Sequence, residues 1–409
     1  MKHKSLATFC LAVFLVTATW AQTEKVLWDF SGNNGDGKAP WSNFLISDSK
    51  GNLYGATGQG GTNSTGMVFV LSPNSSGGYT ETILYDFNAY GSGDGSGPYG
   101  SLAFDKSGDL IGTTSGGGTS SAGTVYKLSP KSGGGWTEKV IYSFSTSGSD
   151  GQYPAAGVTI GKNGALYGTT SFGGANSSGT VYQLTRAGKV WMEKVIHSFG
   201  TSGDGSYPYG GVTLDSLGNL YGTTSIGGAV GYGSIYRLKP TKNGWTETLL
   251  HSFTDQKGDG GGMYYVNLVS DAAGNLYGAT AFGGINNTGT VWELVYSKTT
   301  KKYSEKILHT FGATGGRDGN YPYGGVAMGK TGTLYGTTEN GGSANAGVVY
   351  RLEESGGKWK ETILHNFSGG SSDGQDPSAN LLRDTSGNLF GMAQFGGTSN
   401  DGVVYKVKP

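Results

Sequence analysis

The sequence predicts an all-β fold, a seven-bladed β-propeller with four strands in each blade. Three observations lead to this prediction. A glycine-centred phrase recurs seven times along 409 residues, each repeat holds four short strand-like runs, and the two ends of the repeat array are complementary. Tandem repeats of about this length with four strands each are typical of propeller blades.

The repeated phrase is clearest at 220–228, which reads Leu-Tyr-Gly-Thr-Thr-Ser-Ile-Gly-Gly. Its central glycine returns at intervals of 54 to 58 residues, at Gly55, Gly112, Gly168, Gly222, Gly278, Gly336 and Gly391. In the fourth unit the strand-like runs are 211–215, 219–224, 233–238 and 245–253, which we call strands A to D from the central channel outward. These runs are rich in β-branched and aromatic residues, and Gly or Pro clusters separate them.

The ends of the array predict that the ring closes. Residues 24–30 match a D strand such as 138–144, and residues 402–407 match a C strand. The first segment would therefore complete the seventh blade, whereas an open solenoid needs dissimilar polar caps at its two ends. We expect a single propeller domain over 22–409, with 22–30 as the outer strand of the last blade.

Composition and the first 21 residues predict an exported protein. Lys2 and Lys4 precede an apolar run over 6–16 and a small-residue cleavage site that ends at Ala21, as in a signal peptide at 1–21. The run is too short to span a bilayer, so we expect no membrane span after cleavage. Lys and Arg number 29 and Asp and Glu also 29, which argues against a nucleic-acid partner. We expect the protein to be located outside the cell, at the cell surface or in the periplasm.

The strongest patterns outside the strands lie in the D–A and B–C loops, which alternating strand direction places at one pole. Five aromatic residues follow the proline of the D–A loop or its equivalent, where they would stand at the channel mouth: Trp41, Tyr99, Tyr209, Tyr265 and Tyr323. They are the candidate binding residues, because aromatic faces stack on sugar rings and grip peptides. The alternative is that they fill the narrow space between inner strands.

Three other sets repeat once in each unit. The Asp-Gly aspartates of the D–A loops are Asp36, Asp94, Asp150, Asp204, Asp259, Asp318 and Asp373. A ring of cation sites is one hypothesis for them, but a single carboxylate in most loops favours turn chemistry. The D-strand position of His197, His251, His309 and His365 holds Trp28, Tyr85 and Tyr142 elsewhere, which indicates packing on separate blades. The repeated D-strand glutamates, such as Glu305, are interpreted as edge protection.

Catalysis on a repeated scaffold needs residues that break the repeat. Glu339 and Asp376 do so in neighbouring units, and they are weak candidates for a carboxylate pair that acts on glycosides. No nucleophile elbow, phosphate loop or zinc motif occurs, and the only cysteine, Cys10, lies in the leader. We therefore expect no cofactor.

The phrases Leu-Tyr-Gly-Thr-Thr-x-x-Gly-Gly, Gly-Thr-Val-Tyr-x-Leu and Asp-Gly-x-x-Pro together resemble the GloVer tandem repeat of secreted bacterial proteins described as "choice-of-anchor". The resemblance covers nearly all of the chain after the leader and implies an exported bacterial β-protein, but no catalytic residues. The leading hypothesis is a binding module for a glycan or an extracellular protein. The alternatives are an extracellular hydrolase, lyase or lactonase, and a structural surface protein without a small ligand.

Overall fold

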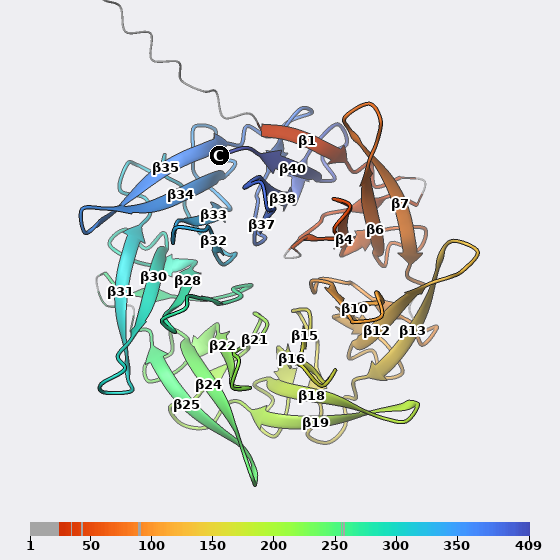
Figure 1. Ribbon diagram of the computed structural model, residues 1–409, viewed down its shortest axis with the longest axis horizontal. Coiled ribbons are helices and arrows are strands. Elements are labelled where there is room, and N and C mark those ends of the chain that lie inside the picture. The colour runs from red at the N-terminus through yellow and green to blue at the C-terminus, as the bar shows by residue number, and fades with distance from the viewer. Residues whose placement is uncertain (1–23, 34, 42–43, 89–90, 255, 257) are drawn as a thin grey trace, which may run out of the picture.

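In the computed structural model, residues 24–33, 35–41, 44–88, 91–254, 256 and 258–409 are described. They form seven four-stranded antiparallel sheets arranged in a ring, as predicted (Figure 1). The signal peptide predicted at 1–21 lies outside the described residues. In the described part of the chain, no helix is long and apolar enough to cross a membrane.

Strands of the same class take equivalent places in every blade. The inner A strands are β3 (Ile46–Ser47), β9 (Ala103–Phe104), β15 (Thr159–Ile160), β21 (Thr213–Leu214), β27 (Val269–Ser270), β32 (Ala327–Met328) and β37 (Leu382–Arg383). The B strands are β4 (Leu53–Thr57), β10 (Leu110–Thr114), β16 (Leu166–Thr170), β22 (Leu220–Thr224), β28 (Leu276–Thr280), β33 (Leu334–Thr338) and β38 (Leu389–Ala393).

The outer half of each blade is longer. The C strands are β6 (Met67–Pro73), β12 (Thr124–Pro130), β18 (Thr180–Ala187), β24 (Ser234–Thr241), β30 (Thr290–Tyr296), β34 (Val348–Ser355) and β40 (Val403–Val407). The D strands are β7 (Tyr79–Asp86), β13 (Trp136–Ser143), β19 (Val190–Ser198), β25 (Gly244–Ser252), β31 (Tyr303–Thr310), β35 (Lys358–Asn366) and, in the seventh blade, β1 (Glu24–Asp29).

The ring closes by pairing its two ends, which confirms the prediction. β1 lies antiparallel to β40 in one sheet, with Glu24 opposite Val407 and Asp29 opposite Val403. The side chain of Lys38 forms an ion pair with Asp401 at 2.7 Å, which adds a polar contact between the first and last segments. The seventh blade is therefore made from both ends of the described chain.

The central glycine of the repeated phrase is explained by the register of strands B and C. Gly222 on β22 lies opposite Tyr236 on β24, and a Cβ atom on Gly222 would overlap the Tyr236 ring. The tyrosine is fully buried between blades, where its ring packs at 5.0 Å from Phe199 of the preceding blade. Glycine is needed here because the aromatic ring occupies the space that a side chain would take.

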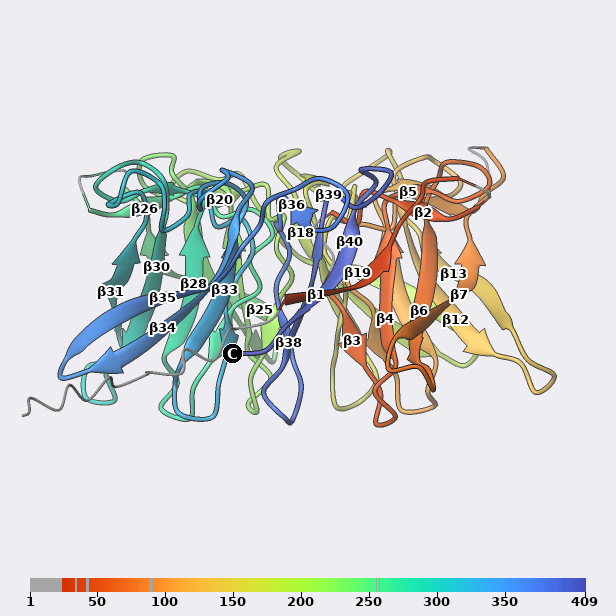
Figure 2. The same ribbon diagram turned by 90° about the horizontal axis from the view of Figure 1, so that it is seen from above.

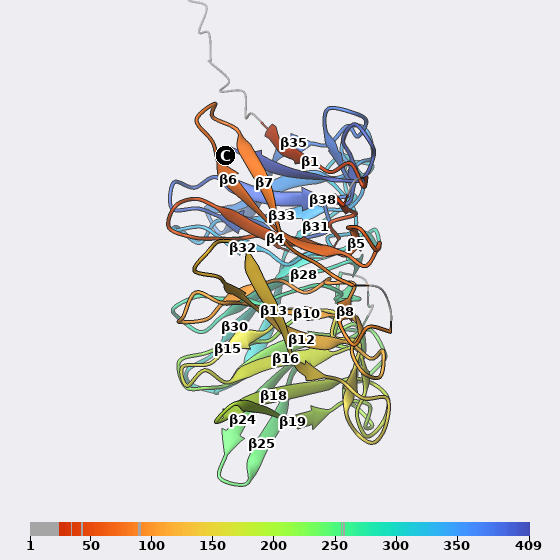
Figure 3. The ribbon, with the colours of Figure 1, turned by 90° about the vertical axis from the view of Figure 1, so that its right-hand side faces the viewer.

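The pole assignment is visible in six small two-stranded sheets that join each D–A loop to the B–C loop of the same blade. They are β2 (Gly37–Lys38) with β5 (Gln59–Gly60), β8 (Gly95–Ser96) with β11 (Gly116–Gly117), β14 (Gly151–Gln152) with β17 (Phe172–Gly173), β20 (Gly205–Ser206) with β23 (Ile226–Gly227), β26 (Gly260–Gly261) with β29 (Phe282–Gly283), and β36 (Gly374–Gln375) with β39 (Phe395–Gly396). In the remaining blade, a single bridge joins Asn320 and Asn340. All of these loops lie at one end of the ring, which we call the loop face (Figures 2 and 3).

Candidate functional site

In the six D–A loops that contain a proline, the residue before it links neighbouring blades at the loop face. Tyr207 occupies this position in the fourth blade with φ at 55°, a conformation that non-glycine residues seldom adopt. Its N–H donates to Ser178 of the preceding blade at 2.8 Å, and its carbonyl accepts from Ser225 of its own blade at 3.2 Å. The strained backbone thereby connects two neighbouring blades at the loop face.

The Asp-Gly aspartates close these loops. Asp259 is representative: Oδ1 accepts from the N–H of Gly260 at 2.7 Å, and Oδ2 accepts from the N–H and hydroxyl of Thr254 at 2.8 and 2.6 Å. Asp36, Asp94, Asp150, Asp204 and Asp373 likewise accept from the N–H of the glycine that follows. This is the turn chemistry that the sequence favoured for the aspartates.

The five predicted aromatic residues gather at the centre of the loop face. Trp41 lies edge-on to Tyr99 with ring centroids 6.4 Å apart, and its ring is 5.8 Å from that of Tyr265. Tyr265 is also 6.1 Å from Tyr209. Tyr323 joins the group through Tyr264, at 5.4 Å. The rings therefore form one connected cluster, contributed by blades on both sides of the channel.

One predicted equivalence is shifted by a residue. Gly260 and Gly205 hold matching places in the small sheets, so the residue that corresponds to Tyr209 is Tyr264. Tyr265 instead takes a place where other blades have a small residue such as Gly210. Without the proline that marks this loop elsewhere, the sequence did not reveal the shift.

Tyr265 largely fills the centre of the ring. The cavity between Tyr99, Tyr209, Tyr265 and the inner strands has a volume of only about 10 Å³, which is enough for about one water molecule. The carbonyl of Tyr265 accepts from the side chain of Asn380, at 3.3 Å, in another blade. A ligand of this face would therefore lie across the loops instead of entering a tunnel.

Further aromatic residues on the same face were missed at the sequence level. Tyr153 and Phe172 pack at 5.8 Å and are 40% and 38% exposed, and Phe172 packs at 5.1 Å on Tyr207. Phe282 lies 6.4 Å from Tyr323 and 6.2 Å from Tyr264. The signals were present, because tyrosine precedes proline in three units and phenylalanine stands in the B–C phrase.

Glu339 and Asp376 are brought near each other at the edge of this cluster. Both are half-buried, and burial followed by the negative charge of Asp376 raises the pKa of Glu339 to about 7. Burial raises the pKa of Asp376 as well. The charge of Glu339 also raises the pKa of Tyr323, second to burial of that ring. A carboxyl group with a pKa near neutrality is able to donate a proton at physiological pH.

The D-strand histidines and glutamates lie at the junctions between blades, away from the aromatic cluster. Each histidine is on a different junction, where it meets the loop aspartate and the D-strand glutamate of the next blade. The interpretation of the glutamates as edge protection is wrong in this respect, since one carboxylate oxygen of each is buried. The order of D strand, D–A loop and next D strand along the chain implies that the histidine, aspartate and glutamate positions meet at one junction. The sequence prediction considered each of these positions alone and therefore missed the contact.

The opposite pole carries grooves between neighbouring blades. One of them has a volume of about 540 Å³ and lies between the fourth and fifth blades, where Tyr221, Arg237 and Tyr303 line it. None of the candidate residues predicted from the sequence lies among the residues that line this groove.

Comparison with known protein families identifies a tandem repeat along the chain, as the sequence predicted. The profile of the Gloeobacter/Verrucomicrobia repeat matches residues 12–159, 134–317 and 294–409. The chain belongs to this repeat family. No curated protein matches the sequence.

Two solved structures resemble the fold. A candidate 6-phosphogluconolactonase from Bacteroides uniformis is 13% identical with a TM-score of 0.51, over 78% of this chain and 83% of that one. A protein of unknown function from Dyadobacter fermentans is 11% identical with a TM-score of 0.47, over 94% and 96% of the two chains. At this identity, the first likeness shows the propeller fold alone.

Proposed function

We propose that this member of the Gloeobacter/Verrucomicrobia repeat family is an exported binding module that holds a glycan on its loop face. The observation that carries the proposal is the connected cluster of aromatic rings around a filled channel, with Trp41 38% exposed. Sugar rings stack on aromatic faces, and tyrosine hydroxyls add hydrogen bonds. Binding across the face suits an extended chain of sugars, which several rings can contact at once.

The test is glycan-array screening of the full chain, followed by calorimetry with the best glycan. Trp41→Ala and Tyr264→Ala should each weaken binding at least tenfold, which corresponds to about 1.4 kcal/mol. Leu217→Ala is the matched control, because Leu217 is 81% exposed on the opposite pole. Equal affinity in all variants, or no glycan bound at all, would remove the proposal. An extracellular protein captured through the same rings would identify the other class of ligand.

A second candidate function is glycoside cleavage by Glu339 and Asp376. It is favoured by the raised pKa values of both carboxyl groups, which lie beside Tyr323. A raised pKa suits Glu339 as a proton donor with Asp376 as its carboxylate partner. The measurement is release of reducing ends from soluble polysaccharides. Glu339→Gln should abolish release while leaving calorimetric binding intact. If the wild type releases no reducing ends from any glycan that it binds, the loop face binds without cleavage.

A further inference from the structure

The seven junctions between blades carry equivalent polar groups near the outside of the ring. Each combines a side chain from one D strand, the aspartate of the following loop and a glutamate from the next D strand. In four junctions the first group is histidine, and the ligand atoms of all three residues lie within 4.8 Å of one another. These are His197–Asp204–Glu247, His251–Asp259–Glu305, His309–Asp318–Glu361 and His365–Asp373–Glu24.

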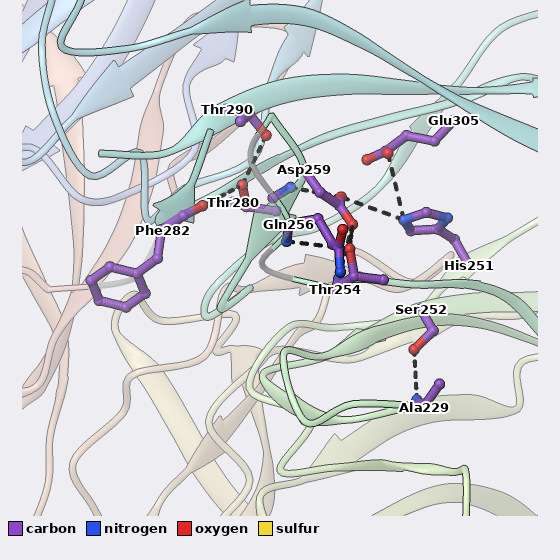
Figure 4. A network of polar contacts seen from close by, with 11 residues as sticks. Ala229, His251, Ser252, Thr254, Gln256, Asp259, Thr280, Phe282, Thr290 and Glu305 are labelled. Atoms are coloured by element: carbon purple, nitrogen blue, oxygen red, sulfur yellow. Dashed lines mark hydrogen bonds and ion pairs between the residues drawn. The ribbon is translucent and has the colours of Figure 1, made fainter. Parts of the chain in front are cut away.

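Two of these junctions are spread wider than hydrogen bonds. Nε2 of His251 lies 3.8 Å from Oδ1 of Asp259 and 3.6 Å from Oε2 of Glu305 (Figure 4). Nε2 of His309 lies 3.8 Å from Oδ2 of Asp318 and 3.7 Å from Oε1 of Glu361. Two ligands bound to one zinc ion at tetrahedral angles would lie about 3.3–3.6 Å apart, given zinc-ligand bonds of about 2.0–2.2 Å. The observed separations need only small adjustments.

The facing atoms lack other partners. Nε2 of His251, Nε2 of His309 and the facing Oε1 of Glu361 are buried, with no hydrogen-bond partner among the described residues. In Glu305 the buried oxygen without such a partner is Oε1, whereas Oε2 is the oxygen that faces His251. Leaving such atoms unpaired is costly, and native structures satisfy nearly all of them. An ion at the centre of each set would satisfy the histidine nitrogen, and at the His309 junction it would also satisfy Oε1 of Glu361.

The aspartate in each junction is already held in place. Thr254 and Gly260 fix the carboxylate of Asp259, and the hydroxyl of Thr314 donates to Oδ1 of Asp318 at 2.7 Å. Such outer contacts orient a metal ligand before the ion arrives. The side chains of His251 and Glu305 retain 20% and 15% exposure, so the junction lies close to the protein surface.

We propose that His251–Asp259–Glu305 and His309–Asp318–Glu361 are two binding sites for a divalent first-row transition metal ion of the Zn²⁺ type. One imidazole and two carboxylates supply three ligands, and water would take a fourth position. Each ion would bridge two D strands, β25 with β31 and β31 with β35. The ions would serve as clips between the fourth, fifth and sixth blades.

The test is titration of the metal-free full chain, produced without a polyhistidine tag, with Zn²⁺ by calorimetry and with Co²⁺ by absorption spectroscopy. The wild type should bind micromolar Zn²⁺, and Co²⁺ should give the visible bands of low-coordinate cobalt. His251→Tyr and His309→Tyr should each remove one equivalent, and the double variant should remove two. Tyrosine is the matched replacement, because Tyr85 and Tyr142 occupy the same position in other blades.

Glu305→Gln and Glu361→Gln provide nearly isosteric second variants, with circular dichroism as the check on folding. They should weaken Zn²⁺ binding at their own site at least tenfold. The proposal is overturned if the metal-free wild type binds no Zn²⁺ at micromolar concentration. It is equally overturned if the folded double tyrosine variant binds as many ions as the wild type.

Discussion

The two junctions of His251 and His309 and the two junctions of Tyr85 and Tyr142 share one backbone arrangement, but they differ in how the D-strand side chain meets the loop aspartate. Where tyrosine occupies the D-strand position, its hydroxyl donates to the loop aspartate, at 2.8 Å from Tyr85 to Asp94 and 2.9 Å from Tyr142 to Asp150. At His251 and His309 the nitrogen instead stands 3.6 to 3.8 Å from two carboxylates. One position can thus complete a junction by a permanent hydrogen bond or leave room for an ion.

The largest effect expected from this comparison is stabilisation by zinc. If both sites bind, Zn²⁺ at 100 times its dissociation constant should stabilise the fold by about 2.7 kcal/mol per site, or about 5 kcal/mol together. Urea unfolding with and without the ion measures this difference. The double variant His251→Tyr/His309→Tyr should show almost none of it, and an equal gain in both proteins would break the comparison.

A transplant in the other direction should have the next largest effect. Tyr142→His places an imidazole beside Asp150 and Glu193, which copies the histidine junctions. The variant should bind one more Zn²⁺ than the wild type and gain about 2.7 kcal/mol more at 100 times the dissociation constant. Calorimetric stoichiometry measures the gain. An unchanged ion count in a folded variant would mean that the new imidazole pairs with Asp150, as His197 does with Asp204 at 3.2 Å.

Removal of one hydroxyl should have a smaller effect. Tyr85→Phe deletes the hydrogen bond to Asp94 while keeping the ring, which packs at 5.1 Å on Phe87. We expect a loss of about 1–2 kcal/mol in the free energy of unfolding, because the carboxylate of Asp94 loses a part-buried donor. The loss should be the same with and without Zn²⁺. A zinc-dependent loss would contradict the assignment of this junction as a closed hydrogen-bonded unit.

The last prediction concerns pH in the junctions without histidine. Burial, then the charges of Asp36, Asp94 and Asp150, raise the pKa of Glu81 to about 8 and those of Glu138 and Glu193 to about 7.

These carboxyls take up protons more strongly in the fold than in the unfolded chain. Their contribution to stability is complete below their ordinary pKa near 4.5 and is lost as pH rises through 7 to 8. Urea midpoints from pH 4 to 9 in chelator should therefore fall with rising pH. The triple glutamine variant at these positions should show a shallower fall, and an identical slope would exclude this origin.

Features encoded by residues within one repeat could be predicted from the sequence, whereas most features that depend on contacts between repeats could not. Ring closure was readable because residues 24–30 repeat a D strand and 402–407 repeat a C strand, and these pair as β1 and β40. The aromatic cluster was predicted in part. The sequence assigned Tyr265 to the position that Tyr264 occupies, because the loop of that blade lacks the proline that marks the position elsewhere. The histidine junctions combine residues from two neighbouring units, so no single repeat contains the histidine, the aspartate and the glutamate of one junction.

The pairing of β1 with β40 has a consequence for the order of assembly. Ribosomes make β1 before every other described strand and β40 last, so the final sheet joins segments at the greatest possible separation along the chain. Contacts of such long sequence range are slow to form. Six blades can form during synthesis while β1 still lacks its partner strand, and the ring can close only once β40 has been made.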